Sequence, residues 1–229
     1  MKKFAEFIPF SINTGKYNMD CDYDILESSI RCSKTHPILR LYGWSPACVS
    51  LGRNQNETCV NKDFCLLNNI DIVRRVTGGR ALLHDNELTY SFVCPCDFLK
   101  NGETVIQSYK EISGAIALGL SYLGINADFP KEKNTGTHFE YCMSLSTGAD
   151  LSFNNKKIVG SAQFRKQGYI LQHGSILLDL DILKIQNIFQ ELPSFDKIIT
   201  IKQIDSALTL ESLCDSLKLG FEEYFNVSF

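Results

Sequence analysis

The sequence predicts an α+β layer fold, with a sheet at its centre and helices around it. Strand-like segments outnumber helix-like segments in the middle of the chain, and helix-like segments lie on both sides of them. The chain has 229 residues, 44% of them hydrophobic and 21% charged, which is an ordinary globular balance. We therefore expect a single domain over residues 1–229, with a core that needs no disulfide bonds.

The N-terminal elements follow from the spacing of apolar residues. Residues 18–29 predict a helix, and residues 37–51 predict two strands joined by a turn that contains glycine, serine and proline. Residues 61–68 predict a short helix capped by Asn61, and residues 71–75 predict a strand. The apolar face of the first helix would consist of Met19, Tyr23, Ile25 and Leu26. In the short helix we expect Phe64, Leu66 and Leu67 to face inward.

The remaining elements are read in the same way. Residues 88–94 alternate as in a strand, and residues 103–123 form the clearest helix, with apolar residues at helical spacing from Val105 to Leu123. Residues 131–148 are polar and predict a long loop, which in a compact domain is often functional. Further strands are expected at 149–153, 157–163 and 169–178, and a mostly helical tail at 181–229.

Charge and hydropathy exclude several classes of partner. The net charge of −3 comes without any basic stripe, so we expect neither nucleic acid nor an anionic membrane as a partner. No run of about 18 apolar residues is present, so no spanning helix is expected. The N-terminal apolar stretch is short, interrupted by Glu6 and followed by no cleavage site, so we expect no signal peptide.

Cysteine usage favours a reducing compartment. The nine cysteines are odd in number and scattered, which is typical of buried thiols in a cytoplasmic protein rather than of a disulfide framework. Cys94-Pro95-Cys96 fits neither a zinc knuckle nor a CxxC redox turn. We expect a cytoplasmic protein without a metal site.

Three short segments carry candidate chemistry, and the first ends a strand. Its glycines would let the backbone approach a ligand closely, while its arginines would bind a carboxylate or phosphate. A hairpin turn with solvated arginines explains the same residues, and no phosphate-binding P-loop motif is present. The candidate substrate-binding residues here are Arg74, Arg75, Thr77, Gly78, Gly79, Arg80 and His84.

The second and third segments combine cationic, small and imidazole side chains. Lys157 could neutralise a carbonyl oxygen or a phosphate, but the pattern by itself favours a turn into a strand with an exposed lysine. The small residues that follow it are Gly160, Ser161, Ala162 and Gln163. In the third segment, Gln172-His173-Gly174-Ser175, the histidine lies in an apolar strand. For His173, as for His84, a hydrogen-bonded core histidine is the alternative to a substrate-binding one.

These three segments, in this order, resemble the catalytic domain of the lipoate and biotin protein ligase and transferase family. The resemblance begins at Asn13-Thr14-Gly15, includes Leu39 to Trp44, and covers roughly residues 10–190. It implies a mixed, largely antiparallel sheet flanked by helices, like the class II synthetase-like catalytic domain of biotin ligases. It also implies that the small and basic residues named above bind substrate.

Within the family, the resemblance is to the octanoyltransferases that work through a cysteine. Arg80 stands where ligases often have a third glycine, and Gln163 and Gln172 fit the transferase form of the motifs. Cys142 lies 15 positions before Lys157, as expected of the nucleophile in that class. The resemblance implies cofactor-free transfer of octanoyl from acyl carrier protein, through Cys142 and Lys157, to a lysine of a lipoyl domain or glycine-cleavage H protein. A cation near Cys142 would favour its thiolate, which is the attacking form.

Three alternatives remain open. The first is an ATP- and Mg-dependent lipoate or biotin ligase, in which Cys142 is incidental; the short C-terminal end favours a transferase without deciding the question. The second is an amidotransferase between lipoyl proteins, and the third is a non-catalytic binder of acyl or lipoyl groups. In the transferase, a basic cluster would steer the acidic carrier protein. Its members would be Lys131, Lys133, Lys156, Arg165 and Lys166.

Overall fold

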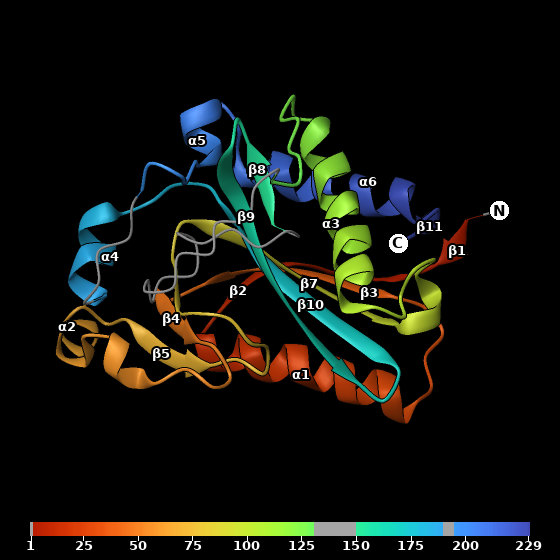
Figure 1. Ribbon diagram of the computed structural model, residues 1–229, viewed down its shortest axis with the longest axis horizontal. Helices are drawn as coiled ribbons and strands as arrows, with labels where there is room; N and C mark the ends of the chain where they lie inside the picture. Colours follow the sequence, from red (N-terminus) through yellow and green to blue (C-terminus); the bar gives the residue numbers. More distant parts are fainter. Residues whose placement is uncertain (1, 131–149, 190–194) are drawn as a thin grey trace.

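A six-stranded sheet is the centre of the computed structural model, which describes residues 2–130, 150–189 and 195–229 (Figure 1). The strand order is β2-β3-β7-β10-β9-β8, and only the β2–β3 pair is parallel. The strands are β2 (Glu6–Asn13), β3 (Ile38–Trp44), β7 (Glu87–Pro95), β8 (Leu151–Phe153), β9 (Lys156–Lys166) and β10 (Tyr169–Leu177). The long β9–β10 hairpin crosses the middle of the molecule in Figure 1.

Two smaller sheets accompany the large one. In the three-stranded sheet, β4 (Cys48–Leu51) lies between β5 (Asp71–Arg74), to which it is parallel, and β6 (Leu82–His84), to which it is antiparallel. The parallel pair of β1 (Lys3–Phe4) and β11 (Val227–Ser228) joins the two ends of the chain. The expected α+β fold with a mixed, largely antiparallel sheet and flanking helices is thus confirmed.

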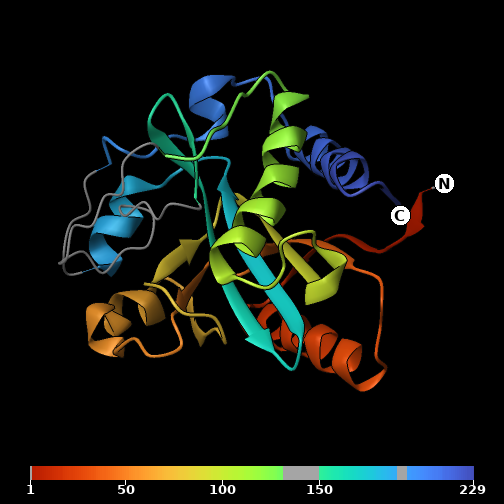
Figure 2. The same cartoon turned by 45° about the vertical axis from the view of Figure 1, so that its right-hand side comes forward.

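Helices cover both faces of the large sheet (Figure 2). α1 lies against one face, and α3 and α6, which contact each other extensively, cover the other. Threonine hydroxyls cap all three long helices, since Thr14, Thr104 and Thr209 accept hydrogen bonds from backbone N–H groups of the first turn. The helices are α1 (Gly15–Arg31), α2 (Lys62–Leu67), α3 (Val105–Ser121), α4 (Ile182–Ile188), α5 (Ile201–Ile204) and α6 (Leu210–Tyr224), with 3₁₀ turns η1 (Glu57–Cys59) and η2 (Cys96–Phe98).

Side-chain alternation gives the sheet one apolar and one polar face. On β7, Leu88, Tyr90 and Phe92 belong to the main hydrophobic core beneath α3 and α6. The intervening residues Glu87 and Thr89 are also buried but lie on the opposite face. β3 and β10 follow the same pattern. The polar residues of these strands therefore meet in the space between the large sheet, α1 and the small sheet, and that space holds the candidate site.

The face that α1 buries differs from the predicted apolar face. Its fully buried residues include Asn18 and Asp22 as well as Leu26, whereas Met19 and Tyr23 are only half-buried. The hydrophobic pattern was misleading because this helix packs on the polar face of the sheet. Its contacts there are hydrogen bonds and ion pairs as much as apolar packing.

The inward orientation predicted for α2 was wrong at two positions. Asn61 caps the helix as expected, because its side chain accepts a hydrogen bond from Phe64 N. Leu66 and Leu67, however, are 82% and 85% exposed, and Cys65 is the buried residue. Phe64 is half-buried and packs against the same hydrophobic cluster as Cys65, so this side of the helix faces inward and the two leucines face solvent.

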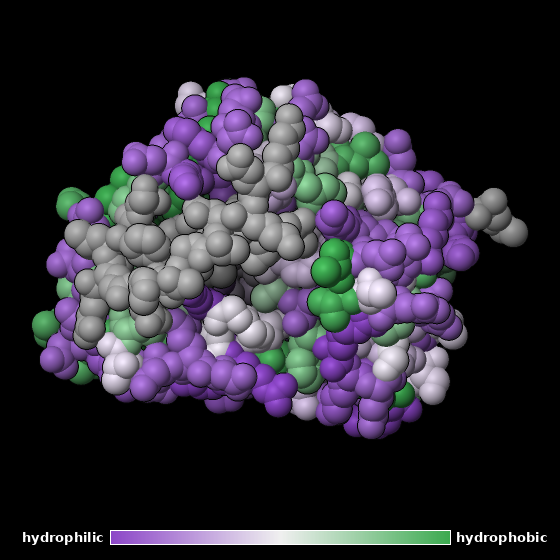
Figure 3. Space-filling model, viewed as in Figure 1, coloured by the Kyte–Doolittle hydropathy of each residue, from purple (hydrophilic) through white to green (hydrophobic). Residues whose placement is uncertain are grey.

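Some large apolar side chains are exposed on the described part of the surface. The face seen in Figure 3 is mostly hydrophilic, with separate apolar residues between the polar ones. Val105 begins α3 in an exposed position, while Ile112, Ile116 and Leu120 are fully buried as predicted. Among the described residues no helix has both the length and the hydropathy to span a bilayer.

Candidate functional site

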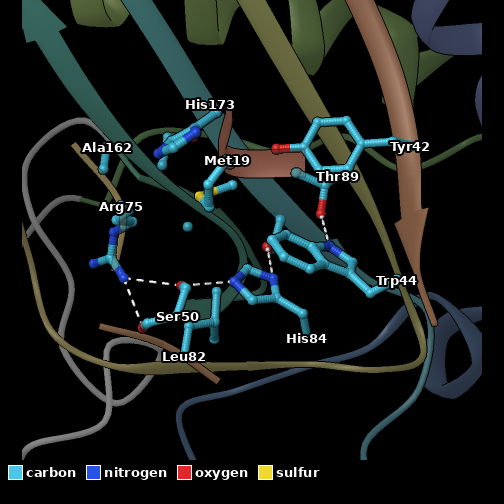
Figure 4. Close-up of a pocket in the computed structure, with 14 residues that line it drawn as sticks. Met19, Tyr42, Trp44, Ser50, Arg75, Leu82, His84, Thr89, Ala162 and His173 are labelled. Atoms are coloured by element: carbon cyan, nitrogen blue, oxygen red, sulfur yellow. Dashed lines mark hydrogen bonds between the residues drawn. The ribbon is translucent and has the colours of Figure 1, made fainter. Parts of the chain in front are cut away.

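A narrow pocket opens between the β9–β10 hairpin, the small sheet and α1 (Figure 4). It encloses about 370 Å³ of space between atoms, part of it open to solvent. Apolar and aromatic groups and about as many polar side chains form its wall. The lining residues are Met19, Tyr42, Trp44, Ser50, Arg75, Leu82, His84, Thr89, Gly160, Ser161, Ala162, His173, Gly174 and Ser175.

His173 lines the pocket and belongs to the first of two hydrogen-bonded chains. Its Nδ1 lies 3.1 Å from Asp22 Oδ2, and its Nε2 lies 2.8 Å from Thr77 Oγ1. All three side chains are buried. Because a carboxylate only accepts, the proton of a neutral His173 belongs on Nδ1, and Nε2 accepts the hydroxyl proton of Thr77.

Asp22 is held by two further donors from β3. Arg40 Nη1 donates to Oδ1 over 2.8 Å, and Tyr42 Oη donates to Oδ2 over 2.8 Å. Burial, together with the nearby Asp22 carboxylate, raises the pKa of Tyr42 well above its usual value, so that the phenol remains a donor. Arg40 also donates to Asn18 Oδ1, and Asn18 Nδ2 donates to the carbonyl of Gly43. This network fixes α1 to the sheet.

His84 begins the second chain. Its Nδ1 lies 2.6 Å from Glu87 Oε1, and its Nε2 lies 2.7 Å from Ser50 Oγ. Glu87 Oε1 also accepts from Thr89 and Ser175, whereas the buried Oε2 has no hydrogen-bond partner within the described parts of the chain. The ring of Trp44 stacks on His84 at 3.9 Å between centroids, and its indole N–H donates to Thr89.

Arg75 connects the second chain to the glycine turn. Nη1 donates to the carbonyl and hydroxyl of Ser50, and Nη2 donates to the carbonyls of Gly78 and Arg80. Gly79 takes φ +96°, and a Cβ there would lie 2.8 Å from Arg75 Nη2, which explains the glycine. Arg75 therefore shapes the turn around itself in addition to lining the pocket.

Other residues of the first segment lie away from the pocket wall. Arg74 points to the surface, where it donates to the carbonyls of Gly52 and Gln55 and pairs with Glu57. Gly78 and Gly79 are exposed, and Thr77 reaches the pocket through His173. The structure thus brings Arg75, Thr77 and His84 to the site and leaves Arg74 at its outside.

The second and third segments lie side by side. In the β9–β10 register His173 is opposite Ala162, and Gly174 is opposite Ser161. A Cβ on Gly174 would meet Ser161 Oγ at 2.5 Å and Gly160 O at 2.6 Å, so only glycine fits. Gln163 lies beyond the pocket and donates to Gln172 Oε1.

Lys157 is buried and paired. Its Nζ lies 3.0 Å from Asp150 Oδ2, and the two side chains are 4% and 2% exposed. Asp150 Oδ1 also accepts a long, 3.4 Å hydrogen bond from Ser161 N. The ion pair therefore connects Lys157 to the backbone of the pocket wall. The exposed lysine on a turn, which was the alternative for this residue, is excluded.

Cys142 lies outside the described residues. Burial raises the pKa of most other cysteines, which makes them poor nucleophiles. The cysteines with a raised pKa are Cys21, Cys48, Cys65, Cys94 and Cys214. No group of three or more histidine, cysteine, aspartate or glutamate side chains in the described ranges could hold a metal ion.

The described residues of the predicted basic cluster do not lie together in space. Lys156 begins and Lys166 ends an 11-residue strand, so about 33 Å separates them at 3.3 Å per residue. Lys166 pairs with Glu27, and Arg165 donates to Cys96 and to the carbonyl of Gly102. Lys131 and Lys133 lie outside the described residues. For the described basic residues, closeness in the sequence therefore does not correspond to a surface patch.

Several residues that line the pocket or hold its two histidines were missed as functional candidates from the sequence. Ser50, Glu87 and Thr89 belong to buried strands, and Asp22 belongs to α1. One signal was available, because Glu87, Thr89 and Ser91 put polar side chains at alternate positions of an otherwise apolar strand. A polar stripe of this kind indicates a sheet face that borders a site.

Comparison with known proteins gives consistent findings. The chain matches the family described as lipoyl protein ligase A/B catalytic domain over residues 14–222. It is 36% identical to octanoyltransferase LipM of Clostridioides difficile, over 94% of this chain and 84% of that protein. It is 35% identical to octanoyltransferase LipM of Bacillus subtilis, over 99% of this chain and 88% of that protein.

Solved structures share the fold. A putative lipoate protein ligase from T. acidophilum with bound lipoic acid superposes with a TM-score of 0.78 at 22% identity, covering 99% of this chain and 88% of that one. A lipoate-protein ligase A bound with ATP gives a TM-score of 0.80 at 22% identity, covering 99% and 87%. At this identity the likeness concerns the arrangement of strands and helices.

Proposed function

Since the chain belongs to the lipoyl protein ligase A/B catalytic-domain family, we propose that it is an octanoyltransferase. It moves an octanoyl group from acyl carrier protein to a lysine of a lipoyl domain or of glycine-cleavage H protein. The observation that carries the proposal is the likeness to octanoyltransferase LipM proteins, at 35–36% identity over nearly the whole chain. The reaction needs no cofactor.

The pocket suits an acyl chain. It is narrow, and Met19, Trp44 and Leu82 contribute apolar surface to its wall. Each methylene of an octanoyl group that leaves water contributes about 0.8 kcal/mol, so burial of most of the chain suffices for recognition. Most polar groups of the wall already hydrogen-bond one another and therefore do not require a polar ligand.

In the first half-reaction the Cys142 thiolate attacks the carrier thioester. A thiol exchanges readily with a thioester, because the acyl-enzyme is itself a thioester of similar energy. The raised pKa values of the buried cysteines support Cys142 by leaving few competing nucleophiles. Lys157 assists as a buried cation next to Asp150.

The tetrahedral intermediate needs hydrogen-bond donors for its oxyanion. We assign this role to backbone N–H groups near Gly160 to Ala162, which line the pocket. Ser161 N now donates to Asp150 over 3.4 Å, longer than the 2.7–3.2 Å of a typical N–H···O bond. It can therefore turn to an oxyanion at small cost.

The test is intact-mass spectrometry after the protein is mixed with octanoyl-acyl carrier protein without ATP. Wild type should gain one octanoyl group, and Cys142→Ala should gain none. Cys32→Ala, which removes an exposed cysteine instead, should behave like wild type. A second mixture with a lipoyl domain should show the acyl group on the acceptor.

The ligase and the non-catalytic alternatives give other outcomes. Acyl transfer that occurs only when free octanoate or lipoate and ATP with Mg²⁺ are supplied would make the protein a ligase. Transfer only from an octanoylated lipoyl protein would make it an amidotransferase. Binding of octanoate with no turnover from any of these donors would leave a binder.

A further inference from the structure

The pocket holds two histidines that are anchored in the same way. His173 is fixed by Asp22 and His84 by Glu87, and the second ring nitrogen of each lies against a hydroxyl, that of Thr77 or of Ser50. Both imidazoles line one pocket, and a buried carboxylate and a buried hydroxyl hold each of them, which is an arrangement suited to proton transfer. The two histidines lie at different positions along the pocket.

The β9–β10 register separates the two ends of the pocket. His173 lies opposite Ala162, beside the backbone to which the oxyanion role was assigned. His84 stacks on Trp44 and connects through Glu87 to Ser175, two residues further along β10 and about 6.6 Å away at 3.3 Å per residue. His173 thus borders the end where the acyl carbonyl would lie, and His84 borders the other end.

We propose that His173 is the base that takes the proton from the acceptor lysine, and that Asp22 is its positioning residue. The assignment rests on the proposed function, which requires a lysine ammonium to become an amine. Lys157 is not suited to this step, because its ammonium lies 3.0 Å from the Asp150 carboxylate and is buried with it. His173 instead lines the pocket, and its Nε2 lone pair accepts from the Thr77 hydroxyl, which the acceptor lysine would replace.

The step balances. The lysine ammonium gives one proton to Nε2 of His173, and the neutral amine attacks the acyl carbonyl. The C–N bond forms and the C–S bond breaks, and the second proton from the nitrogen passes to the departing thiolate. The products are the amide, a thiol and an imidazolium, which the Asp22 carboxylate stabilises before the proton returns to solvent.

The charged and titratable groups near His173 come from each element that forms this part of the pocket. Asp22 on α1 contacts it directly, and Thr77 caps its second nitrogen. The other ionisable groups of the same network and pocket wall are Arg40 and Tyr42 on β3, Arg75 after β5 and His84 on β6. Asp22 remains paired with Arg40 when His173 is neutral, so no buried carboxylate is left without a cation.

The test measures the two half-reactions separately in His173→Asn. An asparagine amide can replace Nδ1–H as a donor to Asp22, so the fold should persist, but it cannot accept a proton. Acyl-enzyme formation from octanoyl-acyl carrier protein should stay within a few-fold of wild type. Single-turnover transfer to a lipoyl domain should fall by about 100-fold or more at pH 7. His173→Gln serves as a second variant, and His36→Gln, a matched change at a histidine far from the pocket lining, as control.

The pH dependence separates a base from a structural residue. In His173→Asn the transfer rate should rise with pH toward the wild-type rate, because the lysine then loses its proton to solvent. Equal loss in both half-reactions, or a defect that is independent of pH, would overturn the assignment. Transfer from octanoyl-adenylate, which needs no thioester, should show the same pH-dependent defect. That arm decides the role of His173 even if no acyl-enzyme forms and the proposed function fails.

Discussion

The guanidinium of Arg40 lies 2.8 Å from the carboxylate of Asp22, and each side chain is only 2% exposed. One partner comes from β3 and the other from α1, so this ion pair joins the helix to the sheet at the edge of the pocket. The same carboxylate holds His173 in place. The pair therefore contributes both to the attachment of α1 and to the position of His173.

Replacing one partner of this ion pair should destabilise the fold far more than replacing both partners by uncharged residues. Asp22→Asn leaves a buried arginine without its anion and should lower the free energy of unfolding by about 3–5 kcal/mol. The double variant Asp22→Asn with Arg40→Met should lose less than the sum of the single effects, because no unpaired charge remains. Urea denaturation, provided that the m-value is unchanged, measures the unfolding free energy of both single variants and of the double variant. Strictly additive losses would show that the two groups do not depend on each other.

Gly174 should tolerate no side chain. In Gly174→Ala the new Cβ would meet Ser161 Oγ, Gly160 O and Tyr90 Cε1 at less than 3.0 Å, so β9 and β10 must separate. We expect a loss of about 1–3 kcal/mol in unfolding free energy. Gly78→Ala, whose Cβ meets nothing within 4 Å, is the stability control and should change it by less than about 0.5 kcal/mol. Equal losses of unfolding free energy in the two variants would mean that β9 and β10 can move apart at little cost.

Glu6 should make the protein less stable in acid. A hydrogen bond from Lys34, and then one from His36, holds the pKa of Glu6 below its usual value of 4.5. A lowered carboxyl pKa stabilises the fold above pH 4.5 and ceases to do so as the pH falls through the folded value. The difference in unfolding free energy between wild type and Glu6→Gln should thus be present at pH 7 and be lost as the pH falls through the lowered pKa of Glu6. Since the pair is partly exposed, it should stay below about 1 kcal/mol.

Alkylation should distinguish the cysteines. Burial raises the pKa of Cys48 and Cys94 far above that of a free thiol, so they should not react with iodoacetamide at pH 7.5 in the folded protein. Cys32 is exposed and should react slowly, and Cys142 should react first if it is the nucleophile. Peptide mass spectrometry over time gives the order. Prior incubation with octanoyl-acyl carrier protein should protect Cys142 and leave Cys32 unaffected.

Much of the fold could be predicted from the sequence because its strongest elements are locally encoded. The helix over 103–123 and the strands at 88–94 and 169–178 were predicted to within two residues at each end. Most of their regularly spaced apolar residues belong to the main core, so periodicity alone identifies them. The mixed sheet order, in which β10 pairs with both β7 and β9, comes from long-range contacts that periodicity does not contain.

Two of the errors share one physical origin. α1 was expected to bury an apolar face, yet it buries Asn18 and Asp22 because the sheet face beneath it is polar. Tertiary pairing of charges decided that orientation, and hydrophobic spacing could not. For the same reason the motif histidines were identified, but their partners Asp22, Glu87 and Ser50 were not, since each lies far from its histidine in sequence or on another element.

The polar packing of α1 has a consequence for how the protein opens. A helix attached by a hydrogen-bonded network, rather than by a broad apolar face, can detach only if that network breaks as a unit. Amide hydrogen exchange in α1 should therefore report on the integrity of the His173 environment. A small molecule that disturbs the helix from its outer, exposed side could then weaken the pocket without entering it.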